Sequence, residues 1–188
     1  MKLTIIEGTP GEIARFFLSP VPQYQLREEP MTVSDDDAEK IFGLDQNWRP
    51  LEYIRNDFED NGDETISDDA TGLMWQKSGS PNRMTNKDAP AYIEKLNREK
   101  FAGYGDWRLP TVDELKSLLT KQKQSNGLYI NPIFDKTQHW CWTSDQCASG
   151  GAWYVYFNLG FVYRDNLDYG YYARAVRAGQ SNIRNEEK

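Results

Sequence analysis

The sequence offers only a few side chains that could carry out nucleophilic or acid–base chemistry. Its single histidine, His139, lies close in sequence to Ser144, and a histidine can activate a serine hydroxyl as a nucleophile. Such a pair needs a third group to orient the imidazole, and no residue near these two supplies one. We therefore interpret His139 as a surface or capping residue and predict no catalytic residues.

The two cysteines, Cys141 and Cys147, are the remaining candidates for a nucleophile. Cys141 lies between two tryptophans in an expected strand, and Cys147 lies in an expected turn. We interpret both as buried or incidental thiols, and a cysteine-dependent oxidase stays open as the weakest alternative. Two cysteines fit a reducing compartment and no disulfide framework. With one histidine and no Cys-x-x-Cys motif we expect no structural zinc and no cofactor.

The acidic stretch 56–72 partly matches a calcium-binding loop. The residues at ligand or glycine positions of that template are Asp57, Glu59, Asn61, Gly62 and Asp68. Glu64, however, stands where a buried apolar residue is expected, the last ligand is Asp instead of Glu, and no helices flank the loop. We favour two hairpin turns around a strand at 65–67, followed by a strand at 73–76. A calcium-stabilised loop stays open, and we predict no metal ligands.

Composition and charge restrict the class of protein. The chain has 188 residues, of which 38% are hydrophobic, so it can bury the core of one domain. A net charge of −7 argues against nucleic acid and anionic membranes as partners. No apolar run is long enough to span a membrane, and Glu7, Gly8 and Pro10 interrupt the N-terminal apolar stretch. We expect a cytoplasmic protein without a signal peptide, with a phage particle or non-standard export left open.

Short elements precede the main domain. We expect residues 1–50 to form a βα extension and linker, with a strand at 3–7, a helix that begins after Thr9, and an irregular stretch at 19–33. A second helix should follow Ser34 and end at Gly43, with Ala38, Ile41 and Phe42 on its apolar face. Its acidic first turn, 35–37, is interpreted as a helix cap and not as a cation site.

The main domain is expected at 51–180, followed by a polar tail at 181–188. One helix should be capped by Thr85 or Asn86, and another by the Thr111–Glu114 capping box. From residue 140 the pattern alternates with period two, which predicts an antiparallel meander and an α+β fold. The last strand is expected at 171–177, with Arg174 paired to Asp113 or Glu114. The predicted inner face consists of Trp142, Trp153, Val155, Phe157, Tyr172, Arg174 and Val176.

The order of motifs resembles the Lcl C-terminal domain family. The segments that carry the resemblance are DNGDETISDDATGLMWQK, FAGYGDWRLPTVDELKSLL, INPIF, AWYVYFNLGFV and YYARAVRAGQ, within residues 54–180. The resemblance implies a C-type-lectin-like fold, with two main helices packed on antiparallel sheets. It also implies kinship with formylglycine-generating sulfatase-modifying enzymes and with variable proteins diversified by retroelements. The tripeptides of calcium-dependent sugar binding are absent from the sequence, so lectin activity does not follow.

The resemblance places scaffold residues in the C-terminal strands and leaves a second, unpatterned set between them. That set is rich in tyrosine, asparagine and aspartate, a composition typical of recognition surfaces. Randomised adenines in asparagine codons give these residue types, but so do ordinary hairpin turns. We predict a non-catalytic module that binds a protein ligand, and the variable protein of a diversity-generating retroelement is the more specific form of this hypothesis. An enzyme related to the sulfatase-modifying group and a structural or adhesion module stay open. The predicted ligand-binding residues are Trp142, Tyr154, Tyr156, Asn158, Tyr163, Arg164, Asp165, Asn166, Asp168, Tyr169 and Tyr171.

Overall fold

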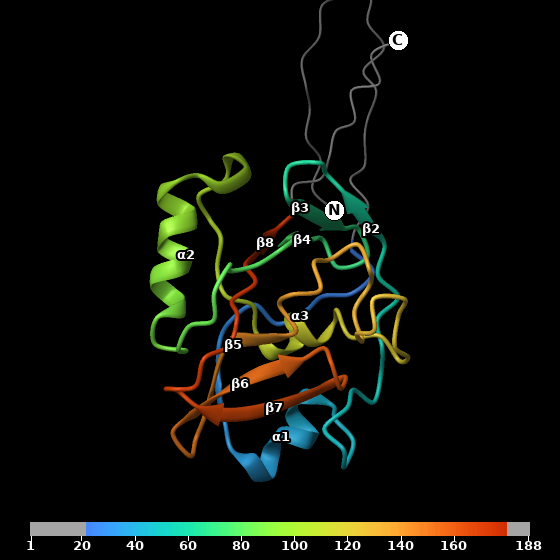
Figure 1. Cartoon of the computed structure of the whole chain (residues 1–188). Helices are drawn as coiled ribbons and strands as arrows, with labels where there is room; N and C mark the ends of the chain where they lie inside the picture. Colours follow the sequence, from blue (N-terminus) through green and yellow to red (C-terminus); the bar gives the residue numbers. More distant parts are fainter. Residues whose placement is uncertain (1–21, 180–188) are drawn as a thin grey trace, which may run out of the picture.

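The computed structural model describes residues 22–179, and this part of the chain forms a mixed α+β fold with three α-helices and two four-stranded sheets. Figure 1 shows one sheet in the upper part of the view, the other in the lower part, and one helix between them. The α+β prediction is confirmed. The strand expected at 3–7, the helix expected after Thr9 and the tail at 181–188 lie outside the described residues.

The lower sheet carries the tyrosine-rich segment. Its strand order is β1 (Thr32–Val33), β5 (Trp140–Cys147), β6 (Gly151–Tyr156) and β7 (Phe161–Asn166). The meander β5–β6–β7 is antiparallel as predicted, but β1 pairs with β5 in parallel, Val33 lying opposite Cys147. Three predictions are therefore wrong in part. The sheets are not purely antiparallel, the 19–33 stretch ends in a strand, and Cys147 lies in β5 and not in a turn. A two-residue strand in a linker has no period that a sequence pattern could reveal.

The upper sheet has the order β2 (Phe58–Asp60), β3 (Thr65–Asp68), β4 (Leu73–Gln76) and β8 (Val176–Ala178). The acidic stretch thus forms the two hairpin turns that we favoured. The last strand is shorter than expected, because the chain crosses between the sheets here. Tyr172 bridges Cys141 in the lower sheet, and Val176 pairs with Trp75 in the upper one.

The first helix, α1 (Asp35–Phe42), begins and ends at the predicted residues. The Ser34 side chain accepts a hydrogen bond from the backbone N–H of Asp37, and Gly43 ends the helix with a left-handed φ of 60°. Ala38 and Phe42 are buried. Ile41, expected on the apolar face, is 47% exposed, because the contact surface of this short helix is narrower than its apolar pattern suggests.

The other two helices differ in how well their starts were predicted. α2 (Ala89–Arg98) begins after Asp88, later than expected, because Thr85 binds Asp88 in a preceding turn: the Asp88 backbone N–H donates to Thr85 Oγ1 over 3.2 Å. A short 3₁₀ turn, η1 (Phe101–Gly103), follows it. α3 (Val112–Lys116) starts at the predicted capping box, since Thr111 and Glu114 make both reciprocal hydrogen bonds.

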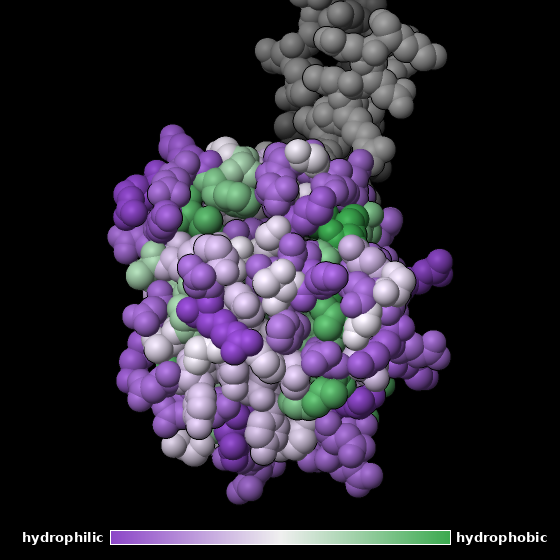
Figure 2. All heavy atoms as spheres, in the orientation of Figure 1, coloured by the Kyte–Doolittle hydropathy of each residue, from purple (hydrophilic) through white to green (hydrophobic). Residues whose placement is uncertain are grey.

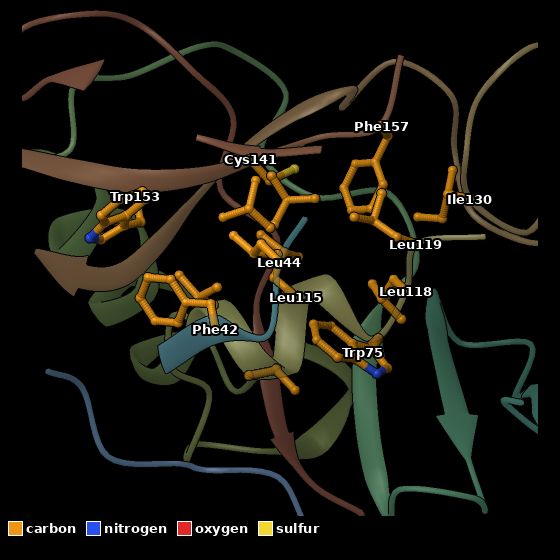
Figure 3. Close-up of a cluster of buried hydrophobic side chains, with 14 of the residues drawn as sticks. Phe42, Leu44, Trp75, Leu115, Leu118, Leu119, Ile130, Cys141, Trp153 and Phe157 are labelled. Atoms are coloured by element: carbon orange, nitrogen blue, oxygen red, sulfur yellow. The ribbon is translucent and has the colours of Figure 1, made fainter. Parts of the chain in front are cut away.

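The main core lies between α3 and the inner face of the lower sheet, and it extends to the upper sheet. Figure 3 shows Leu115, Leu118 and Leu119 directed towards Trp75 on one side and towards Phe157 and Cys141 on the other. Phe42 from α1 packs edge-on against Trp153, at 5.2 Å between ring centroids. Val33 and Leu44 belong to the same core, so residues before position 51 contribute directly to it. A second cluster, which includes Met74, Ile93 and Trp107, packs α2 on the upper sheet.

A buried carboxylate joins the N-terminal segment to this core. Asp145 is 0% exposed and accepts hydrogen bonds from Arg27 Nη1 and Nη2, both 2.8 Å long. It also accepts from the backbone N–H groups of Met31, at 2.7 Å, and Val112, at 2.6 Å. Val112 is the first residue of α3, so the carboxylate lies at a helix N-terminus and beside a cation, both of which stabilise its charge.

The predicted partner of Arg174 is wrong. Glu114 instead binds Arg108 through two contacts of 2.6 Å, and Asp113 binds Arg27 and Lys116. Arg174 is fully buried and donates to the carbonyl oxygens of Gln76 (2.8 Å) and Lys77, with its guanidinium over the ring of Phe134 at 5.0 Å. Arg174 directs its side chain towards β4 and not towards α3, and alternation along a single strand cannot distinguish these two neighbours.

Candidate functional site

The β5–β6–β7 sheet has an inner face against the main core and an outer face that carries a separate aromatic cluster. Cys141 lies opposite Val155, and these residues face the core with Trp153 and Phe157. Trp142 lies opposite Tyr154 and Trp140 opposite Tyr156, which places these four on the outer face. The prediction that Trp142 lies on the inner face is wrong. In β5 it is Cys141 that faces the core, and its neighbour Trp142 lies opposite Tyr154 on the outer face.

Part of the predicted recognition set is covered. Trp142 is 0% exposed and Tyr154 is 7% exposed, and Tyr171 lies against both rings with centroid distances of 4.5 and 4.6 Å. The Tyr171 hydroxyl donates to Asp165 Oδ2 over 2.5 Å, and Trp142 Nε1 donates to the Met84 carbonyl over 2.9 Å. These residues therefore bind one another and fix the turn after β7.

The buried side chain of Tyr154 gives an expected pH dependence. Burial and the nearby Asp165 raise the pKa of Tyr154 to about 12, and burial raises that of Tyr171 as well. A phenol whose pKa is raised by folding holds its proton longer in the native state, so stability falls as pH rises from about 10, the unfolded value, towards 12. In urea titrations, Tyr154→Phe should flatten this alkaline loss. An unchanged alkaline slope would contradict the assignment.

Four partly exposed outer-face rings and Trp48 form a row, which we call the aromatic row: Trp140, Tyr156, Phe161, Tyr163 and Trp48. Trp48 is its core end, because its ring also packs on Trp153 at 5.8 Å between centroids. Successive ring centroids are 5.1, 5.3, 6.2 and 5.1 Å apart. In Figure 2 pale atoms, which mark residues of intermediate hydropathy, gather over β6 and β7 in the lower part of the view. Such rings offer large contact areas with little rotamer entropy to lose on binding.

Polar members of the predicted set lie at both ends of β7. The Asn158 side-chain amide donates to the Tyr156 hydroxyl over 3.3 Å. Asn166, Asp168 and Tyr169 are exposed in the turn after β7, where Tyr169 is 58% exposed and Asp168 pairs with Lys87 at 2.8 Å. Arg164 is half-buried and forms an ion pair with Asp35 at the start of α1. The predicted residues are thus near one another, but several are engaged within the chain.

Four residues of this surface were missed by the sequence reasoning. Trp140 and Phe161 could have been found from the sequence. Trp140 lies two residues before Trp142 and so shares its strand face, and Phe161 lies opposite Tyr156 across the hairpin. Trp48 and Arg83 come from loops distant in sequence. The guanidinium of Arg83 lies over the Trp140 ring at 4.4 Å and near the Tyr172 ring at 5.8 Å. No local pattern in the sequence indicates this contact.

A family model described as the Lcl C-terminal domain matches residues 64–177. The chain belongs to the Lcl C-terminal domain family. The match includes β4, α2, α3 and β5–β7, so the Lcl domain contains most of the aromatic row, while Trp48 and the Asp145 partner Arg27 precede it. No curated protein matches the chain. Among residues 22–179, no helix is both long and apolar enough to cross a membrane.

The side chains of the Lcl domain that could act as a nucleophile or a base each have a different hydrogen-bond partner. His139 Nδ1 is 2.8 Å from the Thr137 carbonyl oxygen, while the Ser144 hydroxyl donates to the Pro110 carbonyl over 3.2 Å. Cys141 is 0% exposed, and burial raises the pKa of its thiol to about 11. Cys147 is 3% exposed and contacts Ser149 and Asp35. A protonated, enclosed thiol such as that of Cys141 is a poor nucleophile.

The polar side chains of the acidic hairpins form hydrogen bonds with backbone and side-chain groups of the same segment. The Asp68 carboxylate accepts from Asn56, the Asp57 and Ala70 N–H groups, and Thr71. The Asn61 amide donates to Thr65 and Ser67. Across residues 22–179 no group of three or more His, Cys, Asp or Glu side chains is placed to hold a metal ion.

Two hollows lie away from the aromatic row. They share Tyr24, Gln25 and Leu26 as lining residues, and they have volumes of about 810 Å³ on the α3 side and about 380 Å³ on the β4 side. The predicted recognition residues all lie within the described part of the chain, and none of them lines either hollow.

Proposed function

We propose that the protein is a non-catalytic binding module whose aromatic row recognises a protein ligand. The observation that carries this is the contrast between the two faces of one sheet. The inner face is filled by the core, while the outer face presents four aromatic rings in contact and partly exposed to solvent, with Trp48 beside Tyr163 at the end of the row. Aromatic side chains of this kind dominate the energetics of protein interfaces.

The fold supports this proposal. The helices α2 and α3 pack with the two sheets, and the last strand, β8, returns beside β4. This arrangement fits the C-type-lectin-like fold that the family implies. The rigid core beneath the row keeps its rings in place before a ligand arrives, which reduces the entropy lost on binding. An enzyme is the weaker alternative, because the thiol of Cys141 is enclosed and His139 and Ser144 hydrogen-bond to different carbonyls.

The proposal predicts a large effect of Tyr156, which contacts a ring of the row on each side, Trp140 and Phe161. A random peptide library is panned on the immobilised full chain, and the affinity of a selected peptide is measured by calorimetry. Tyr156→Ala should weaken binding by about thirtyfold, the effect of removing a central aromatic contact.

Tyr24→Ala is the matched control. Tyr24 is also a partly exposed tyrosine, but its backbone binds Ala70 beside the upper sheet. This variant should bind the peptide like the wild type. Equal affinities of Tyr156→Ala and wild type would show that the row is not the binding surface.

Diversification by a retroelement is the finer form of this proposal. Exposed and half-exposed predicted positions concentrate in β7 and the turn after it, where variation costs the core little. The neighbouring DNA tests it. Diversification requires a near-copy of the C-terminal coding segment, differing mainly at adenines, beside a reverse-transcriptase gene, and the absence of both would exclude it.

A further inference from the structure

We propose that Arg83 and Trp140 form a carboxylate-binding corner of the aromatic row, which takes an acidic side chain of the protein ligand. This inference rests on the proposed function and adds the chemistry of one contact. It also adds two residues, neither of which belongs to the predicted recognition set.

The guanidinium of Arg83 contacts two aromatic rings and has no polar partner in the described part of the chain. Its Cζ lies 4.4 Å from the Trp140 ring centroid and 5.8 Å from that of Tyr172, while the residue as a whole is exposed. Within residues 22–179 its side chain makes no hydrogen bond and no ion pair. A guanidinium that lies over an indole can still donate from its N–H groups to a carboxylate in a bidentate contact.

The loop that carries Arg83 is fixed at both ends. On one side the Ser80 N–H donates to the Ala173 carbonyl over 2.7 Å. On the other side Met84 and Tyr171 exchange backbone hydrogen bonds of 2.7 and 3.0 Å. The loop position is therefore set by the same segment that supplies Tyr171 and Tyr172, and the guanidinium is placed before a ligand binds.

Arg83 differs from four other arginines of the chain, which each have a carboxylate partner. The sequence has 29 acidic and 22 basic residues, and Arg27, Arg108, Arg164 and Arg177 each pair with a carboxylate. In the turn after β7, the Asp165 carboxylate is bound by Tyr171 and the Asp168 carboxylate by Lys87. The His139 ring also contacts Trp140, at 4.3 Å between ring centroids.

A carboxylate next to an apolar or aromatic group satisfies this corner. The acid would meet the N–H groups of the Arg83 guanidinium, and the adjacent group would pack on Trp140 and Tyr156. One guanidinium matches the single charge of a carboxylate in bidentate geometry, and a guanidinium that already lies over an indole loses little side-chain entropy on binding.

The test compares acid-dependent binding between variants of the full chain. Peptides selected from a random library on the wild type should be enriched in Asp or Glu beside an apolar residue. For one such peptide, Arg83→Gln and the replacement of its acid by the amide should each weaken binding about tenfold, as expected for one charge-assisted contact. The two changes together should cost little more than either alone, because they remove the same contact.

Arg98→Gln, which alters an exposed arginine in the last turn of α2, is the control and should leave affinity unchanged. Selected peptides without acid enrichment, or effects of the two changes that simply add, would overturn the carboxylate corner. If such peptides still depend on Tyr156, the proposed function stands and only this inference fails. If no peptide binds the wild type better than the Tyr156→Ala variant, both fail.

Discussion

Replacing Asp145 with alanine should lower the free energy of unfolding by about 3–5 kcal/mol, the largest effect that we expect for a polar residue. The carboxylate is completely buried and accepts four hydrogen bonds, two of them from Arg27. Its removal leaves the backbone N–H groups of Met31 and Val112 without their acceptor, and Arg27 keeps only Asp113 and the Glu29 carbonyl as acceptors. Urea denaturation followed by tryptophan fluorescence measures the change.

Asp113→Ala is the matched control, since Asp113 binds the same Arg27 at 3.0 Å but is 22% exposed. An ion pair that water can reach contributes about 1 kcal/mol or less. We therefore expect Asp113→Ala to cost far less than Asp145→Ala. Equal costs for the two variants would mean that the N-terminal segment is held mainly by its apolar contacts and not by the buried carboxylate.

Trp153→Ala should cost about 3–5 kcal/mol of stability, whereas Trp140→Ala should cost about 1 kcal/mol or less. Trp153 is 0% exposed, packs on Phe42 and donates from its ring nitrogen to the Gln146 carbonyl over 3.1 Å. Trp140 lies opposite Tyr156 on the outer face of the same sheet and is partly exposed. Urea denaturation of the two variants and of the wild type tests this contrast.

The same two variants separate folding from binding. Trp140→Ala should remain folded and lose affinity for a peptide selected on the wild type, because it removes one end of the aromatic row. If Trp140→Ala instead unfolds the protein as readily as Trp153→Ala, the outer face is part of the core and the division between the two faces is wrong.

Local signals in the sequence predicted the elements that depend on local chemistry. The Ser34 cap, the Gly43 stop and the Thr111–Glu114 capping box each act within a few residues, so their hydrogen bonds could be deduced from spacing alone. The alternation of β6 likewise predicted that Trp153 and Val155 face the core while Tyr154 and Tyr156 face outwards.

The errors lie where two distant segments meet. Trp142 alternates with Cys141 as predicted, but only the register with β6 shows which of the two faces the core. The partner of Arg174 was misassigned, because a long side chain at the crossover can reach either a helix or a neighbouring strand. Each of these errors concerns a contact that the period of one segment cannot determine.

The candidate site was predicted in part for the same reason. β6, β7 and the turn after β7 supplied Tyr156, Asn158, Tyr163 and Tyr169 as outward residues, because these belong to one meander. Trp48 and Arg83 reach the row from loops that precede it by many residues, and only the folded chain brings them there. Tyr154 and Tyr171 are of a residue type that is typical of recognition surfaces, but here they pack on each other, and Tyr171 binds Asp165 and so fixes the turn after β7.

The most direct test of the binding account is a nuclear magnetic resonance titration of the isotope-labelled full chain with a peptide selected on it. The account predicts that signals shift for Trp140, Tyr156, Phe161 and Tyr163, including the indole N–H of Trp140, while those of α2 stay in place. Shifts confined to α2, or to the hollows lined by Tyr24 and Leu26, would contradict it, because the ligand would then bind a face other than the aromatic row.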